Sequence, residues 1–140
     1  MSYALRPYLN FPGTTREAME FYRSVFGGEL VLNTFGDFHA LPEGSPSLDK
    51  VMHSELRSEH ITLAAADEIE ETPFEVVYGN AVTLAIMGDA DSEQELRAAF
   101  DRLAEGGQVM MALDKQVWGD IYGSLTDRFG TGWQFNITAA

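Results

Sequence analysis

The residues of this chain best suited to chemistry are His53 and the carboxylate two positions after it, Glu55. Both lie in a predicted strand, residues 51–57, in which side chains alternate between the two faces of a sheet. Because Met52 and Leu56 are apolar and should face the core, His53 and Glu55 should share the opposite face. A neutral imidazole beside a carboxylate is a possible general base, so His53 is the candidate catalytic residue. The alternative is a histidine hydrogen-bonded within a sheet or at a subunit interface.

Polar side chains in the first and last predicted strands could line a binding site on the same side. In the first strand Tyr8 and Asn10 alternate with apolar residues, and in the last strand Gln134 and Asn136 do so. If the apolar residues face the core, these four side chains face away from it. Their amides and phenol could orient a ligand, and the alternative is that they serve only as polar surface.

A third candidate region is aromatic and rich in glycine. Trp118 and Tyr122 are each followed by a glycine, at positions 119 and 123. Glycine permits close backbone approach, and large rings can then lie over a cavity. Ring stacking on a planar or hydrophobic ligand is one interpretation, and an interface or rim cluster is the other.

Composition narrows the classes of partner. The 140 residues contain 22 acidic and nine basic side chains, which gives a net charge of −13. This charge repels nucleic acid and anionic lipid, so neither partner is expected. No cysteine is present, which excludes disulfides and thiolate metal sites, and a cytoplasmic location is the expectation.

Two similar segments, residues 14–28 and 92–107, predict the helices that position these strands. Each begins with a hydroxyl residue followed three positions later by glutamate, the pattern of a capping box. The pairs are Thr14 with Glu17 and Ser92 with Glu95. Each continues with apolar residues at helical spacing and ends at a glycine pair, which can adopt the left-handed conformation that terminates a helix. The repetition predicts a duplicated chain.

Each half of the chain reads as strand, helix and three further strands. The predicted strands are 6–11, 29–35, 51–57 and 61–65 in the first half, and 81–87, 108–113, 122–126 and 132–137 in the second. One helix for four strands covers only one face of a sheet, so the other face should be open. The prediction is a single α+β domain, residues 1–140, built from two repeats at about 5–68 and 80–138.

Short motifs along nearly the whole chain resemble those of one superfamily. They are Pro7 to Phe11, Glu17-Ala18 with Phe21-Tyr22, Phe26 to Gly28, Val51 to His53, Ala104 to Gly107, Trp118-Gly119 with Tyr122-Gly123, and Asp127 to Gly130 with Trp133. In this order they resemble the vicinal oxygen chelate superfamily of glyoxalases, bleomycin-resistance proteins and dioxygenases, in its PhnB-like branch. The resemblance implies two tandem βαβββ modules that form a cupped mixed sheet, usually completed in a homodimer.

The resemblance also implies where a divalent metal would be bound. Members of the superfamily place a histidine at the head of the first strand of each module and a carboxylate late in the last strand. Here these positions fall on Arg6, near Ala81 and on Gln134, with Asp67 and Glu68 just beyond the last strand of the first module. Arginine, alanine and a neutral amide are poor ligands for a transition metal, so no metal cofactor is expected.

Two classes of function follow. The first is a protein that binds a small organic molecule in the cup without a metal. Its predicted ligand-binding residues are Tyr8, Asn10, His53, Trp118, Tyr122, Gln134 and Asn136. The second is a lyase, isomerase or dioxygenase that uses a metal bound elsewhere in the cup or acid–base chemistry at His53. The net charge favours neutral or cationic ligands unless Arg6 offsets it locally.

Overall fold

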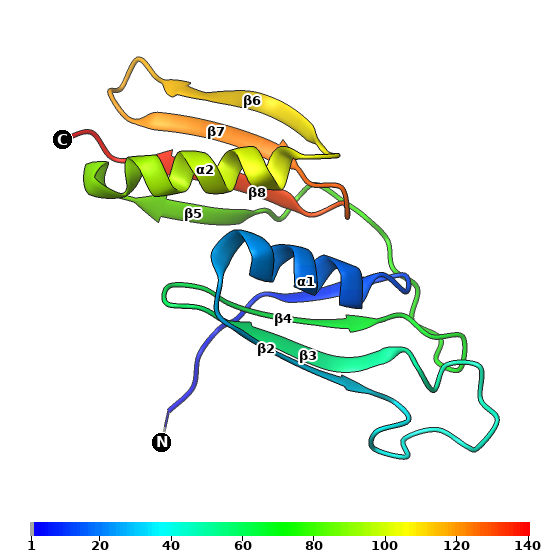
Figure 1. The fold of residues 1–140 in the computed structure, drawn as a ribbon. Coiled ribbons are helices and arrows are strands. Elements are labelled where there is room, and N and C mark those ends of the chain that lie inside the picture. The colour runs from blue at the N-terminus through cyan, green and yellow to red at the C-terminus, as the bar shows by residue number, and fades with distance from the viewer. Residues whose placement is uncertain (1) are drawn as a thin grey trace. The chain divides into compact units, whose positions relative to one another are not determined.

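Each half of the chain forms a four-stranded mixed sheet with one α-helix packed on it (Figure 1). The computed structural model describes residues 2–140, and the chain divides into two units, the first ending at Val77 and the second beginning at Tyr78. Neither α-helix in the described residues is long and apolar enough to cross a lipid bilayer. The α+β fold class and the two tandem βαβββ modules are confirmed.

The first unit places its two terminal strands side by side. Its elements are β1 (Tyr8–Phe11), α1 (Thr15–Phe26), β2 (Glu29–Thr34), β3 (Val51–Arg57) and β4 (Thr62–Asp67). The strand order is β1-β4-β3-β2, with β1 parallel to β4 and the other neighbours antiparallel. The polar segment between β2 and β3 forms a loop.

The second unit repeats this arrangement. Its elements are β5 (Leu84–Gly88), the 3₁₀ turn η1 (Ala90–Ser92), α2 (Glu93–Ala104), β6 (Gln108–Lys115), β7 (Ile121–Thr126) and β8 (Gly132–Ile137). The order β5-β8-β7-β6, with β5 parallel to β8, is the topology of the first unit over again. The duplication read from the helices therefore extends to strand order and direction.

The first strand of each unit is shorter than predicted. β1 begins at Tyr8 and β5 at Leu84, so Arg6 and Ala81 precede the strands that were expected to contain them. In β1 the limit has a physical cause, because Pro7 has no N–H to donate and contributes only its carbonyl, which accepts from Ala64. In β5 the parallel ladder with β8 starts only at the pair formed with Trp133.

The predicted capping boxes do not form. Neither Thr14 nor Ser92 makes a side-chain hydrogen bond to its helix. Carboxylates from outside the helices take this role: Asp67 at the end of β4 accepts the Thr15 N–H at 3.0 Å. Asp89 accepts the N–H of Ser92 at 3.2 Å and its hydroxyl at 3.1 Å, which starts the 3₁₀ turn. A carboxylate binds an N–H more strongly than a hydroxyl does, so these aspartates displace the local pattern.

The first glycine pair ends its helix as predicted, whereas α2 ends at its cap residue Glu105 in an extended conformation, one residue before Gly106. Gly27 ends α1 with φ of +73°. The second glycine of each pair lies against the last residue of a strand, in β3 or in β7. A Cβ on Gly28 would be 2.2 Å from the Arg57 carbonyl oxygen, and one on Gly107 would be 2.3 Å from that of Thr126. Both contacts are impossible for a larger residue, so the second glycine of each pair permits a close approach of the backbone to the end of a strand.

The core of each unit lies between its helix and one face of its sheet. In the first unit its large members are Phe11, Met19, Tyr22, Leu56 and Leu63, and in the second Leu103, Leu125, Trp133, Phe135 and Ile137. Phe100 of α2 meets Phe135 of β8 edge to face, with ring centroids 5.3 Å apart. This packing leaves the opposite face of each sheet without a helix (Figure 1).

Candidate functional site

The sheet face opposite α1 carries the first group of predicted site residues. On β1, Phe11 is 1% exposed against the helix, whereas Tyr8 is 48% exposed on the other side. On β3, Ser54 and Leu56 are buried, so His53 alternates to the same uncovered side as Tyr8. We call this surface the first open face, with these members: Tyr8, Asn10, Glu29, Val31, His53, Glu55 and Arg57.

A hydrogen bond joins two of its predicted members. The Tyr8 hydroxyl lies 3.1 Å from Nδ1 of His53, and the two rings are 5.8 Å apart with their planes tilted by 35°. Partial burial raises the pKa of the Tyr8 phenol, so it remains protonated at neutral pH. The hydrogen bond orients the imidazole and leaves its Nε2 free to meet a ligand. Whether Nε2 donates or accepts depends on the tautomer that the phenol selects.

The next residue on this face, Glu55, is held as an anion. Arg57 donates a hydrogen bond from Nε to Glu55 Oε1, and Arg6 approaches the same oxygen at 3.8 Å. The hydrogen bond from Arg57 is the main cause of a lowered pKa for Glu55, and the positive charges of Arg57 and Arg6 add to it. Glu55 is therefore a fixed carboxylate between two guanidinium groups, and it lies next to the imidazole of His53.

A shallow hollow lies on this face. Its volume is about 280 Å³. It is lined by Glu29, Val31, His53, Glu55 and Arg57, all from β2 and β3. It combines one exposed apolar side chain with charged groups and an imidazole, and a small molecule could be held there by both kinds of contact.

The uncovered face of the second sheet carries the second group. Trp133 and Phe135 are buried, so Gln134 and Asn136 alternate to the side away from α2, together with Tyr122 of the neighbouring β7. The amides already have partners: Gln134 Nε2 donates to Thr83 Oγ1 at 2.9 Å. Asn136 Nδ2 donates to Asp120 Oδ2 at 3.3 Å. Each amide therefore keeps its carbonyl oxygen for another contact.

Trp118 lies in the turn between β6 and β7. Its side chain is 60% exposed, and its ring centroid is 6.4 Å from that of Tyr122. Gly119 takes a φ of +102°, a conformation that disfavours other residues and reverses the chain just after the tryptophan. The two predicted aromatic residues therefore lie beside each other, and much of the tryptophan is exposed.

A buried carboxylate holds the strand that carries the amides. Asp127 is 3% exposed, and its Oδ1 accepts from the backbone N–H groups of Phe129 and Thr131 at 2.8 and 3.1 Å. Its Oδ2 accepts the indole N–H of Trp133 at 2.9 Å. This network fixes the turn before β8 and thereby the register in which Gln134 faces the open side.

The predicted ligand-binding residues thus form two groups, one in each unit. Tyr8, Asn10 and His53 share the first open face, while Trp118, Tyr122, Gln134 and Asn136 belong to the second unit. Sequence reasoning overlooked Glu29, Val31 and Arg57. Strand alternation could have found Arg57, since it lies two residues after Glu55 and four after His53 on the same strand. The antiparallel pairing of β2 with β3 then adds Glu29, opposite Arg57, and Val31, opposite Glu55.

The residues at the superfamily's metal positions do not fit a metal. Arg6 is engaged by Glu55, Ala81 has no donor atom, and Gln134 offers one neutral oxygen. On the uncovered faces, the pairs formed between the parallel strands are Tyr8 with Ala64, Asn10 with Ala66, Ala85 with Gln134 and Met87 with Asn136. Within residues 2–140, no group of three or more His, Cys, Asp or Glu side chains is arranged to hold an ion.

The carboxylates near the end of β4 have structural partners. Asp67 accepts the Thr15 N–H through Oδ1 at 3.0 Å and the Val51 N–H through Oδ2 at 2.9 Å. Glu68 accepts the N–H of Val76 at 3.1 Å. Asp67 thus holds the start of α1 and the start of β3 against the end of β4, which is a sufficient reason for its presence.

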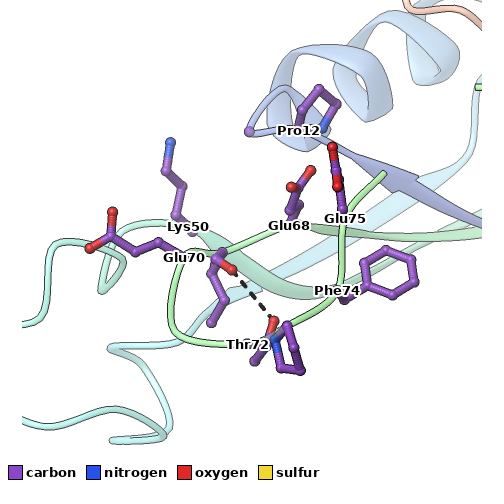
Figure 2. A pocket seen from close by; sticks show the side chains of 10 residues that line it. Pro12, Lys50, Glu68, Glu70, Thr72, Phe74 and Glu75 are labelled. Atoms are coloured by element: carbon purple, nitrogen blue, oxygen red, sulfur yellow. Dashed lines mark hydrogen bonds between the residues drawn. The ribbon is translucent and has the colours of Figure 1, made fainter. Parts of the chain in front are cut away.

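A second and larger hollow, of about 560 Å³, lies where the β1–α1 turn meets the segment after β4 (Figure 2). Lys50 and Glu70 lie at one end of it and Phe74 at the other, while Thr72 is bonded to the carbonyl of Ile69. Its lining contains none of the residues predicted for the site.

Comparison with known proteins supports a common family. The model of the Glyoxalase/Bleomycin resistance protein/Dioxygenase superfamily matches residues 8–135. Protein YjdN of Escherichia coli is 25% identical over 138 residues, which cover 95% of this chain and 94% of that protein.

Solved structures agree in fold over the whole chain. The structure of PA1353 from Pseudomonas aeruginosa is 36% identical, with a TM-score of 0.81, and the match covers 99% of this chain and all of that one. A Bacillus cereus protein described as a putative 3-demethylubiquinone-9 3-methyltransferase, PhnB protein, is 24% identical with a TM-score of 0.74, covering 97% and 100%. At that identity the likeness shows the fold alone. The chain belongs to the glyoxalase/bleomycin resistance protein/dioxygenase superfamily.

Proposed function

We propose that this protein binds a small organic molecule on the first open face, without the metal that enzymes of the superfamily use. The observation that carries the proposal is the hydrogen bond between Tyr8 and His53 beside a hollow that His53 itself lines. An oriented imidazole at the edge of an uncovered hollow is the arrangement expected of a group that contacts a ligand.

The chemistry of the hollow suits a compact ligand with one ring. Val31 offers apolar contact, while His53 and Arg57 offer directed hydrogen bonds. A volume of about 280 Å³ lies at the small end of the range of ligand pockets.

The uncovered face of the second sheet is a separate candidate surface for ligand contact. The ring pair of Trp118 and Tyr122 offers a planar aromatic surface, and Gln134 and Asn136 each have an amide oxygen left to accept a hydrogen bond. An aromatic group stacked on Trp118 would gain contact area at little cost in side-chain entropy.

Acid–base catalysis at His53 is the second candidate. It is favoured by the same contact, since an imidazole whose Nδ1–H donates to the Tyr8 phenol oxygen presents an unprotonated Nε2 that can act as a base. Binding and catalysis differ in one observable: only the catalyst would convert a bound compound and release a product.

A screen of metabolites and antibiotics by protein-observed NMR tests the proposal. Hits should shift the amide signals of Val31 and His53. The substitution His53→Ala should weaken the binding of these hits about tenfold or more. His60→Ala, in the exposed turn between β3 and β4, is the matched control and should leave binding unchanged. Hits that bind equally well to the His53→Ala protein would overturn the proposed site, and turnover of a hit would establish the catalytic alternative.

A further inference from the structure

We infer that the ligand of the first open face carries a carboxylate attached to a planar ring, with the carboxylate bound by Arg57. The inference rests on the proposed function and adds the chemical class of the ligand.

The local charge of this face differs from that of the whole chain. The net charge of −13 disfavours anions, but charges are screened over about 8 Å at physiological ionic strength. The charged groups of the first open face and its border are two positive ones, Arg6 and Arg57, and two negative ones, Glu29 and Glu55. This face is therefore neutral in sum, and the arrangement of its charges decides which ligand it favours.

Glu55 is already neutralised by its neighbours. Arg57 binds its Oε1 through Nε, and Arg6 lies 3.8 Å from the same oxygen. The hydrogen bond from Arg57 and the positive charges of both guanidinium groups lower the pKa of Glu55, in agreement with these contacts. An incoming cation would have to compete with both arginines, so the carboxylate is a poor anchor for it.

The terminal amino groups of Arg57 are available to bind a ligand. Only its Nε is used for Glu55, its side chain is 66% exposed, and it lines the hollow. The two remaining amino groups form a planar fork that matches the two oxygens of a carboxylate. A lysine at this position would provide a charge without this geometry.

The ring follows from the other lining residues. Val31 is exposed on β2 in register with Glu55, so an apolar surface lies directly beside the guanidinium groups. The imidazole of His53, oriented by Tyr8, lines the same hollow. A flat ring over Val31 would bring its substituents within reach of His53 while its carboxylate meets Arg57.

The negative charge of Glu29 should repel the proposed ligand, so a substitution of Glu29 tests the sign of the ligand's charge. Glu29 is paired in register with Arg57 across the β2–β3 hairpin and lies in the lining of the hollow. Its negative charge should weaken the binding of a carboxylate, so its removal should have the opposite effect to the removal of Arg57.

The experiment compares three planar compounds of nearly equal shape: benzoate, benzamide and benzamidinium. Each is titrated into the full-length protein and followed by the amide signals of Val31 and His53. Benzoate should bind about three- to fivefold more tightly than benzamide, the range expected of a partly exposed charged pair, and benzamidinium more weakly than both. Arg57→Gln should abolish the preference for benzoate, Arg57→Lys should retain part of it, and Glu29→Gln should increase it. Arg23→Gln, at an exposed position of α1, is the matched control and should change nothing.

The outcomes separate this inference from the proposed function. Equal dissociation constants for the three compounds, with shifts centred on His53, would overturn the carboxylate preference and leave ligand binding on this face standing. Preference for benzamidinium, or no shift with benzoate, would overturn the inference as well. Shifts confined to other parts of the chain would contradict both.

Discussion

Tyr8 and His53 are 45 residues apart in the chain and on strands that are not neighbours, yet the phenol oxygen of one lies 3.1 Å from the imidazole of the other. β4 runs between their strands, and Ala64 of β4 pairs with Tyr8 on one side and with Glu55 on the other. Two strand spacings amount to about 10 Å, so the contact needs a small residue on β4 beneath it. The alanine-rich sequence of β4 thus permits a contact between its two neighbours.

A larger side chain at position 64 should therefore disrupt the contact between Tyr8 and His53. Ala64→Leu would fill the space beneath the phenol ring, and we expect the Tyr8–His53 hydrogen bond to be lost. The imidazole nitrogen shifts of His53, measured by NMR, should change towards those of a tautomeric mixture, and binding on the first open face should weaken about tenfold. Ala98→Leu, at an exposed position of α2, is the control. Unchanged His53 signals in the Ala64→Leu protein would contradict this account.

The turn that precedes β8 should depend on the charge of Asp127. Its carboxylate accepts three hydrogen bonds, and the amide of Asp127→Asn has only one oxygen to accept them. We expect the free energy of unfolding, measured with urea, to fall by about 2 kcal/mol, because buried donors lose their partners. Asp101→Asn, on the exposed side of α2, should change it little. Equal stability of the two variants would show that the network contributes nothing.

Acid should weaken the link between the β2–β3 loop and the segment after β4. Glu71 accepts hydrogen bonds from the hydroxyl groups of Ser45 and Ser47, and these bonds lower its pKa. A carboxyl group whose pKa is lower in the folded state stabilises the fold above its unfolded pKa of about 4.3. That contribution disappears as the pH falls towards the lower, folded pKa. Glu71→Gln should therefore flatten the acid side of the stability profile relative to Glu70→Gln, and identical profiles would argue against the link.

We also predict a homodimer. The exposed methionines Met87 on β5 and Met110 and Met111 on β6 leave apolar surface on the second sheet that a symmetric partner could cover. Light scattering of the purified protein at micromolar concentration should give twice the mass of the chain. A monomeric mass would contradict the prediction.

The sequence predicts most of this fold because its signals are local. β3 and β8 have the predicted bounds, since alternating apolar residues mark both faces of each strand. The start of β1 could have been predicted from Pro7, whereas β5 begins where its ladder with β8 begins, and the sequence alone does not give that position. The cap of α1 was predicted incorrectly because Asp67, which binds the Thr15 N–H, is 52 residues away.

The site was predictable only in part. Alternation placed His53 on the correct face, but the residue that bonds to it lies beyond an intervening strand, and sequence spacing gives no such distance. The role of Arg57 was overlooked because an exposed arginine at the end of a strand resembles ordinary surface, and its significance comes from Glu29 and Val31 on the paired strand.

The central claim is that this face binds a small molecule without a metal, and calorimetry tests it most directly. The strongest compound from the screen is titrated into protein treated with a chelator and into protein supplied with divalent metal. We expect equal dissociation constants in both, a loss of about tenfold or more in His53→Ala, and none in His60→Ala. Binding that disappears with the chelator and returns with the metal would contradict the account.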